Sequence, residues 1–142
     1  MTAPVPSDAR ELVITSDLAE ARRVQTQIEQ DLNAVEFGER EMFGIKLALE
    51  EALVNAIKHG NKMDRNKFVR VVYRVTPERF DIRITDEGPG FDPGDVPDPT
   101  APECLERPSG RGLLLMRHYM TEVEYRDCGR VVEMSRLRNG RA

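Results

Sequence analysis

Residues 68–85 read F-V-R-V-V-Y-R-V-T-P-E-R-F-D-I-R-I-T, and this stretch decides the class of the fold. It contains two runs rich in β-branched and aromatic residues, 68–75 and 80–85, which flank the short polar segment Thr76-Pro77-Glu78-Arg79. Such a pattern predicts two neighbouring strands joined by a hairpin turn. The hairpin departs from the alternating βαβα order of a Rossmann fold.

Two helices are predicted on the N-terminal side of this hairpin, after a short strand at Glu11–Thr15. The first runs from Leu18 to about Val35, behind the N-cap candidate Ser16-Asp17. The second runs from about Arg40 to Lys58, and Gly60 after it suits a left-handed C-terminal position. One apolar stripe of the second helix recurs every three or four residues: Met42, Ile45, Leu49, Ala52 and Ala56.

The C-terminal side begins with a long segment, residues 86–110, that contains six prolines. A loop of this length in a small domain is usually functional or disordered. A short helix from Gly112 to about Met120 follows, and strands at Glu122–Asp127 and Val131–Leu137 form a second hairpin. The order β-α-α-β-β-loop-α-β-β predicts an α+β fold, with helices on one face of a mixed or antiparallel sheet.

Length and composition indicate one globular domain. The chain has 142 residues, a net charge of −4 and a pI near 5.3, so direct binding to nucleic acid is not expected. No apolar run approaches the roughly 20 residues that span a bilayer, and the N-terminus lacks a secretion signal, which predicts a cytoplasmic protein without membrane contact. Cys104 and Cys128 form no CxxC pair. We expect a flexible arm at 1–10, the domain at 11–138 and a tail at 139–142.

A polar face lies along the second predicted helix. Glu51, Asn55 and His59 follow one another at intervals of four residues, away from the apolar stripe. A carboxylate can act as a general base, and an Asn oxygen suits Mg²⁺. A solvated stripe that ends in a helix cap is the alternative, and the spacing alone leaves both readings open.

Two glycine-containing segments form a second and a third motif. Asp86-Glu87-Gly88-Pro89-Gly90-Phe91 directly follows a predicted strand, where a carboxylate can accept a hydrogen bond from an exocyclic amine and glycines let backbone approach a flat ring. Ser109-Gly110-Arg111-Gly112-Leu113 opens a helix, whose unpaired amides and positive dipole end favour phosphate. Taken singly, each segment is also typical of an ordinary turn or a flexible helix entry.

In this order the three motifs resemble the N, G1 and G2 boxes of the GHKL-type (histidine-kinase-like) ATPase superfamily. The resemblance covers about residues 12–137 and is strongest to the bacterial anti-sigma-factor serine/threonine kinases. It is carried by A-L-E-E-A-L-V-N-A-I-K-H-G-N at 48–61 and by S-G-R-G-L-L-L-M-R at 109–117. It implies a two-layer sandwich of the Bergerat type, with a mostly antiparallel sheet, that uses ATP and Mg²⁺.

The resemblance also implies a role for each matching residue. Glu51 would be the general base or would orient the accepting hydroxyl, and Asn55 would hold the Mg²⁺ that bridges the phosphates. Asp86 would read the adenine amine. The loop Phe91–Ser109 would be the ATP lid and would carry Arg107 near the γ-phosphate. The other residues expected at the nucleotide are His59, Gly88, Gly90, Gly110, Arg111, Gly112 and Leu113.

By the same resemblance, the chain is expected to phosphorylate a serine on an anti-anti-sigma partner of the STAS type, to sequester a sigma factor and to form a homodimer. One departure concerns the last hairpin, where family members often carry Gly-Thr, with the Thr at the phosphates, and this chain has Gly129-Arg130. Arg130 either substitutes electrostatically or lowers nucleotide affinity. Two other functions stay open, a non-catalytic ATP-binding adapter and a histidine-kinase catalytic domain acting in trans.

Overall fold

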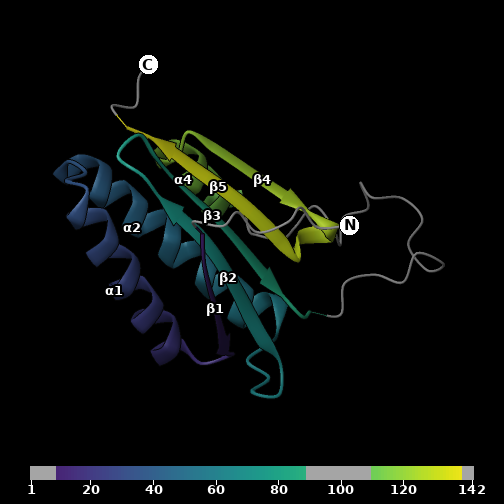
Figure 1. The fold of residues 1–142 in the computed structure, drawn as a ribbon. Coiled ribbons are helices and arrows are strands. Elements are labelled where there is room, and N and C mark those ends of the chain that lie inside the picture. Colours follow the sequence, from purple (N-terminus) through teal and green to yellow (C-terminus); the bar gives the residue numbers. More distant parts are fainter. Residues whose placement is uncertain (1–8, 89–109, 139–142) are drawn as a thin grey trace.

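A computed structural model describes residues 9–88 and 110–138, and every structural statement below concerns these residues. The chain folds into a five-stranded sheet with helices packed on one side (Figure 1). The elements in chain order are β1 (Arg10–Thr15), α1 (Leu18–Ala34), α2 (Glu39–Val54), the π-helix η1 (Asn55–Gly60), β2 (Phe68–Val75), β3 (Arg79–Asp86), α4 (Gly110–Tyr119), β4 (Glu122–Arg126), the 3-10 turn η2 (Asp127–Gly129) and β5 (Val131–Leu137).

The sheet has the strand order β1-β2-β3-β5-β4, and all four pairings between these strands are antiparallel. The predicted hairpins are the β2–β3 and β4–β5 pairs, whereas β3 and β5 become neighbours only after the chain has passed through α4. The predicted α+β class and the mostly antiparallel sheet are therefore confirmed. The described part of the chain contains no helix that is long and apolar enough to cross a membrane.

Alternation along the strands gives the sheet two different faces. On β3, Phe80, Ile82 and Ile84 are buried, while Arg79, Asp81 and Arg83 between them are only partly buried. Successive side chains of a strand point to opposite faces, so the apolar set packs against the helices and the charged set faces away from them. Asp86 has the same parity as the apolar set and is buried with it. The strand pattern thus carries one carboxylate to the helix side, at the end of β3.

The first helix begins as the sequence predicts. Asp17 is its N-cap and accepts a hydrogen bond from the backbone N–H of Ala19 at 2.9 Å. This bond satisfies one of the unpaired amides of the first turn. The buried positions of α1 share the helical spacing of an amphipathic helix: Ala21, Val24, Ile28 and Leu32.

The end of the second helix differs from the prediction. The α-helix stops at Val54, and the chain continues as a π-helix over Asn55–Gly60. A widened turn of this kind is rare and often lies at a functional site. The expected left-handed position at Gly60 is wrong, because positive φ occurs instead at Lys62 (54°) and Met63 (61°). The π-helix buries the consecutive residues 55–57, which an α-helical turn would spread around its axis.

Several sequence predictions fall outside the described residues. They are residues 1–8 of the expected arm, the expected lid Phe91–Ser109 with Arg107, Gly90 of the second motif, and the tail 139–142. The proposed domain boundaries therefore remain predictions. The strand β1 begins at Arg10, one residue before the predicted start.

Candidate nucleotide-binding site

A small hollow on the helix side joins three parts of the chain. It lies between the α2–η1 segment, the end of β3 and the β4–β5 hairpin. Its lining combines apolar side chains with a few polar ones: Ala52, Asn55, Ala56, His59, Ile84, Asp86, Tyr125, Gly129, Arg130 and Val132. Its cavity volume is only about 10 Å³, so what makes it a candidate site is the small number of polar groups that converge on it.

Asp86 lies at the buried end of this hollow. Asp86 is only 5% exposed, and its Oδ1 accepts a hydrogen bond from the backbone N–H of Gly88 at 2.8 Å. The backbone N–H of Asp86 donates to the carbonyl of Arg130 at 2.9 Å, which fixes β3 against the last hairpin. A carboxylate held in this way can accept a hydrogen bond from an amine that enters the hollow.

Gly88 is required by the close approach of two backbone segments. A Cβ at this position would lie 2.6 Å from the carbonyl oxygen of Gly60 and 2.9 Å from Oδ1 of Asp86. Any other residue would push the turn after β3 away from η1. The glycine of the second motif therefore joins the first motif to the second.

Asn61 also joins these motifs, and sequence reasoning gave it no role. Its Oδ1 accepts a hydrogen bond from the backbone N–H of Glu87 at 2.7 Å. Its Nδ2 donates to Oγ of Ser16 at 2.9 Å and to the carbonyl of Phe68 at 3.0 Å. The side chain is fully buried. Its place directly after His59-Gly60 in the quoted motif was the available signal.

Asn55 carries a buried polar atom without a partner in the described part of the hollow. The residue is 8% exposed, and its Nδ2 is buried without a hydrogen-bond partner among the described residues. A buried amide is costly unless it is paired, so such a group indicates a missing polar partner. His59 lines the same hollow but is exposed at its surface. Asn55 and His59 thus line one hollow, although the chain between them is a π-helix and not the predicted α-helix.

Glu51 faces the start of α4 rather than the hollow. A Cβ at Gly112 would lie 2.2 Å from Oε2 of Glu51, so the carboxylate lies directly against the first turn of that helix. The positive end of a helix dipole favours an anion at this place. The neighbouring Glu50 is exposed.

Comparison with known protein families supplies the deciding observation. The family described as "Histidine kinase-like ATPase domain" matches this sequence over residues 14–136. The chain belongs to this family.

Relatives of this ATPase domain include named protein kinases. The serine-protein kinase RsbW of Bacillus licheniformis is 34% identical over 104 residues, which cover 67% of this chain and 64% of that protein. RsbW of Bacillus subtilis is 33% identical over 107 residues, with coverage of 70% and 67%. The serine/threonine-protein kinase BtrW of Bordetella bronchiseptica is 31% identical over 85 residues, with coverage of 58% and 60%. The chain spans about two thirds of the length of these relatives.

A solved structure agrees with the fold of this ATPase domain. It contains the RsbU and RsbW domains of a Mycobacterium tuberculosis protein. The TM-score is 0.62 at 17% sequence identity, and the match covers 95% of this chain and 33% of that chain. At this identity the likeness concerns the fold alone.

The remaining predicted site residues fall into two groups. Gly110 is the first residue of α4, and Leu113 on the same helix is partly buried and packs against the core. The structure therefore gives Leu113 a packing position. The side chains of Arg111 and Arg107, and all of Gly90, lie outside what the structure describes. Within the described residues, no three His, Cys, Asp or Glu side chains gather as a metal cluster would require.

Proposed function

We propose that the chain binds ATP together with Mg²⁺ and transfers the γ-phosphate to a serine of a STAS-type anti-anti-sigma protein. One observation carries the proposal: Asn55 and Asp86 share a hollow in a histidine kinase-like ATPase domain, and Glu51 lies close by at the first turn of α4. The relatives that are named serine-protein kinases support the same class of reaction.

The base of the nucleotide would occupy the hollow. Ile84 and Val132 give it apolar walls, and Asp86 offers a carboxylate at the buried end. The adenine amine would donate to this carboxylate. The phosphates would then lie toward the start of α4, because the positive end of a helix dipole favours anions.

The residues present fit a magnesium ion beside the phosphates. Asn55 would hold it through its Oδ1, because the residue lines the hollow and an amide oxygen suits Mg²⁺. Its Nδ2, which lacks an acceptor among the described residues, would be free to donate to a phosphate oxygen. When bound, Mg²⁺ would neutralise phosphate charge and align the γ-phosphate. The carboxylate of Glu51 lies near the start of α4 and would repel the phosphates. A magnesium ion would offset this repulsion and so favour phosphate binding.

In the transfer itself, Glu51 would accept the proton of the attacking serine hydroxyl. The serine oxygen forms a bond to the γ-phosphorus, and the bond from that phosphorus to the bridging oxygen breaks, which releases ADP. The amides at the start of α4 stabilise the charge on the transferring group. Glu51 faces Gly112 at this helix start, and the serine would approach the γ-phosphate from that side.

The test is phosphate transfer from radiolabelled Mg-ATP to STAS-type proteins of the same genome. Wild type should give an acid-stable phosphoserine. Glu51→Gln should lower the rate by about 10²-fold or more, the scale of a general base, while ATP still binds. Glu50→Gln is the matched control and should stay near wild type. An acid-labile phosphohistidine would instead show a histidine-kinase domain acting in trans.

A second candidate is a non-catalytic ATP-binding adapter. It is favoured by Arg130, which lines the hollow at the position where the family resemblance implies Thr. Tight ATP binding without transfer to any STAS-type partner, unchanged by Glu51→Ala, would support this function. No nucleotide binding at all by wild type would overturn both candidates.

We also propose that the chain sequesters a sigma factor and forms a homodimer. The strand β1 supports the second part, because it lies at an edge of the sheet and its Val13 is 58% exposed. An edge strand offers unpaired backbone groups to another chain. Light scattering of wild type and Val13→Asp tests the dimer: a dimer that dissociates in the variant supports this edge, and a wild-type monomer contradicts the proposal.

A further inference from the structure

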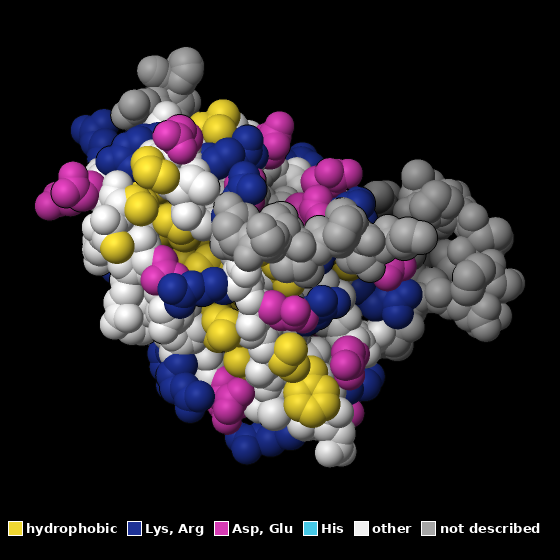
Figure 2. Space-filling model, in the orientation of Figure 1, with side chains coloured by type: hydrophobic (Ala, Val, Ile, Leu, Met, Phe, Trp, Pro, Cys, Tyr) yellow, Lys and Arg dark blue, Asp and Glu magenta, His cyan; other side chains and the backbone are white. Residues whose placement is uncertain are grey.

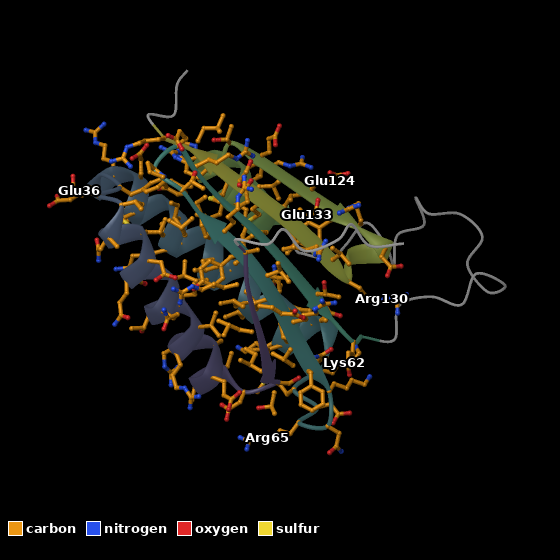
Figure 3. The ribbon with its side chains drawn as sticks, in the orientation of Figure 1. Glu36, Lys62, Arg65, Glu124, Arg130 and Glu133 are labelled. Atoms are coloured by element: carbon orange, nitrogen blue, oxygen red, sulfur yellow. The ribbon has the colours of Figure 1, made fainter. Side chains whose placement is uncertain are left out.

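Arg130 lies beside the carboxylate that would read the base. It is located at the turn between β4 and β5 (Figure 3), and its carbonyl accepts the backbone N–H of Asp86 at 2.9 Å. Arg130 and Asp86 both line the same hollow. The backbone bond between them therefore brings one anionic and one cationic residue to the same hollow.

The guanidinium of Arg130 has one nitrogen that is hydrogen-bonded and another that lacks a partner among the described residues. Its Nη2 donates to Oδ1 of Asp127 at 3.2 Å. Its Nε is buried and has no hydrogen-bond partner among the described residues. Asp127 has a left-handed backbone with φ of 56°, and this turn sets the carboxylate that orients the guanidinium. Burial of an unpaired N–H is unfavourable, so a ligand acceptor at this point would remove a cost.

The surroundings of Arg130 suit a base rather than phosphates. Most of the hollow is apolar or small, with Ile84, Val132 and Tyr125 among its walls. A triphosphate would lose its water there, whereas a flat ring would bury apolar surface. Glu51 and Gly112, which mark the start of α4, are not part of this lining.

We propose that Arg130 is a base-reading residue whose Nε–H donates to ring nitrogen N1 of adenine. Asp86 accepts a hydrogen bond from the 6-amino group of adenine, which is on the carbon next to N1. The two side chains together therefore recognise the amine donor and the N1 acceptor of the base. This inference rests on the proposed binding of ATP. It assigns Arg130 to the base, whereas the family resemblance implies a phosphate contact at this position. It also makes N1 of the base a determinant of affinity.

The experiment compares ATP with 1-deaza-ATP, which has a C–H in place of N1, by calorimetry. Wild type should bind 1-deaza-ATP about tenfold more weakly, the scale of a hydrogen bond to a charged donor. Arg130→Ala should bind ATP about tenfold more weakly than wild type and should not distinguish the two nucleotides. Arg126→Ala is the matched control, since it removes an arginine of the same hairpin whose side chain pairs with Glu133. It should discriminate as wild type does.

Each other outcome contradicts a different part of the argument. If wild type binds ATP and 1-deaza-ATP equally, Arg130 does not read N1, although ATP binding stands. If Arg130→Ala weakens both nucleotides but keeps the tenfold difference, Arg130 acts at the phosphates. Tighter binding of GTP than of ATP by wild type also overturns the inference, because N1 of guanine carries a hydrogen. If wild type binds no nucleotide, the proposed function itself fails.

Discussion

The two faces of the sheet are made by the same strands and have opposite chemistry. On β3 the helix side carries Phe80 and Ile84, and the open side carries Asp81 and Arg83. Figure 2 shows charged side chains of both signs interspersed over the face that it presents. The side-chain period of a strand is two, so a slip of one residue would exchange the two faces. The contrast between them specifies the register.

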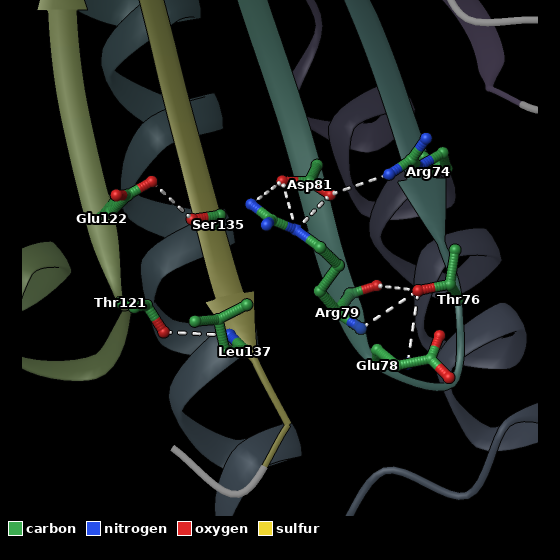
Figure 4. A network of polar contacts seen from close by, with 9 residues as sticks. All are labelled: Arg74, Thr76, Glu78, Arg79, Asp81, Thr121, Glu122, Ser135 and Leu137. Atoms are coloured by element: carbon green, nitrogen blue, oxygen red, sulfur yellow. Dashed lines mark hydrogen bonds and ion pairs between the residues drawn. The ribbon is translucent and has the colours of Figure 1, made fainter. Parts of the chain in front are cut away.

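The open face is organised by ion pairs across strands. Arg70 pairs with Glu11, and Arg83 and Arg126 both pair with Glu133. Figure 4 shows the part around the β2–β3 turn, where Arg79 binds Asp81 through three contacts of 2.7 to 3.1 Å. Such pairs are partly exposed and contribute little each. We infer that the helix side supplies most of the stability and the chemistry, and that the open side keeps the sheet soluble.

The largest expected difference between the faces concerns stability. Leu49→Ala removes a fully buried side chain of α2 and should lower the free energy of unfolding by about 3 kcal/mol. Leu137→Ala, at the exposed end of β5 on the open side, should change it by about 0.5 kcal/mol or less. Urea denaturation of both variants measures the two values. Similar losses would show that the open face is covered in solution.

The next prediction concerns Gly88, which packs the turn after β3 against η1 on the helix side. Gly88→Ala should lower the free energy of unfolding by about 1–3 kcal/mol, because its Cβ would meet the backbone oxygen of Gly60 at 2.6 Å. The turn that holds Asp86 should shift, and ATP should bind more weakly. Gly38→Ala is the control, since its Cβ would have an ordinary contact of 3.5 Å with Glu41. Equal stability of the two variants would contradict the close packing described.

A smaller effect is expected at the polar contact that joins α1 to the helix side of the sheet. The hydroxyl of Tyr73 donates to Oδ2 of Asp31 at 2.6 Å, and burial, together with this bond, raises the pKa of Tyr73 above its ordinary value. Tyr73→Phe should lower the free energy of unfolding by about 1 kcal/mol at pH 7. Since the folded pKa is raised, the contribution of Tyr73 to stability is complete below about pH 10 and is lost as pH rises further. The gap between wild type and variant, measured by urea denaturation, should therefore shrink above pH 10. A gap that is constant with pH would exclude this linkage.

Much of this contrast could be predicted from the sequence. The alternation in residues 68–85 is local and strong, so both strands of the hairpin and their two faces follow from it. Glu51, Asn55 and Asp86 could be selected because their motifs are short and contiguous. The structure places Asn55 and Asp86 at one hollow, and Glu51 at the adjacent start of α4.

The parts that could not be predicted depend on contacts between distant segments. The π-helix at Asn55–Gly60 breaks the helical spacing for one turn only, and it is packed against Gly88 from another element. The roles of Asn61 and Arg130 likewise arise from hydrogen bonds to Glu87 and Asp86, across 26 and 44 positions of the chain. Neither bond leaves a periodic signal in the sequence.

The smallest effects are expected among the charges of the open face, and they can have opposite signs. Arg79→Gln removes the bidentate pair with Asp81, a bond that raises the pKa of Arg79. The variant should lower the free energy of unfolding by about 1 kcal/mol or less at low salt, and by less still at 1 M salt, because salt screens exposed pairs.

Glu124 lies directly opposite Glu133 on the neighbouring strand (Figure 3), and like charges in directly opposite positions repel. Glu124→Gln should therefore be neutral or stabilise the protein by about 0.5 kcal/mol. Urea denaturation at two salt concentrations measures both. A loss on Glu124→Gln would mean that this carboxylate has an attractive partner in solution, and that the open face is more than a set of weak, self-contained ion pairs.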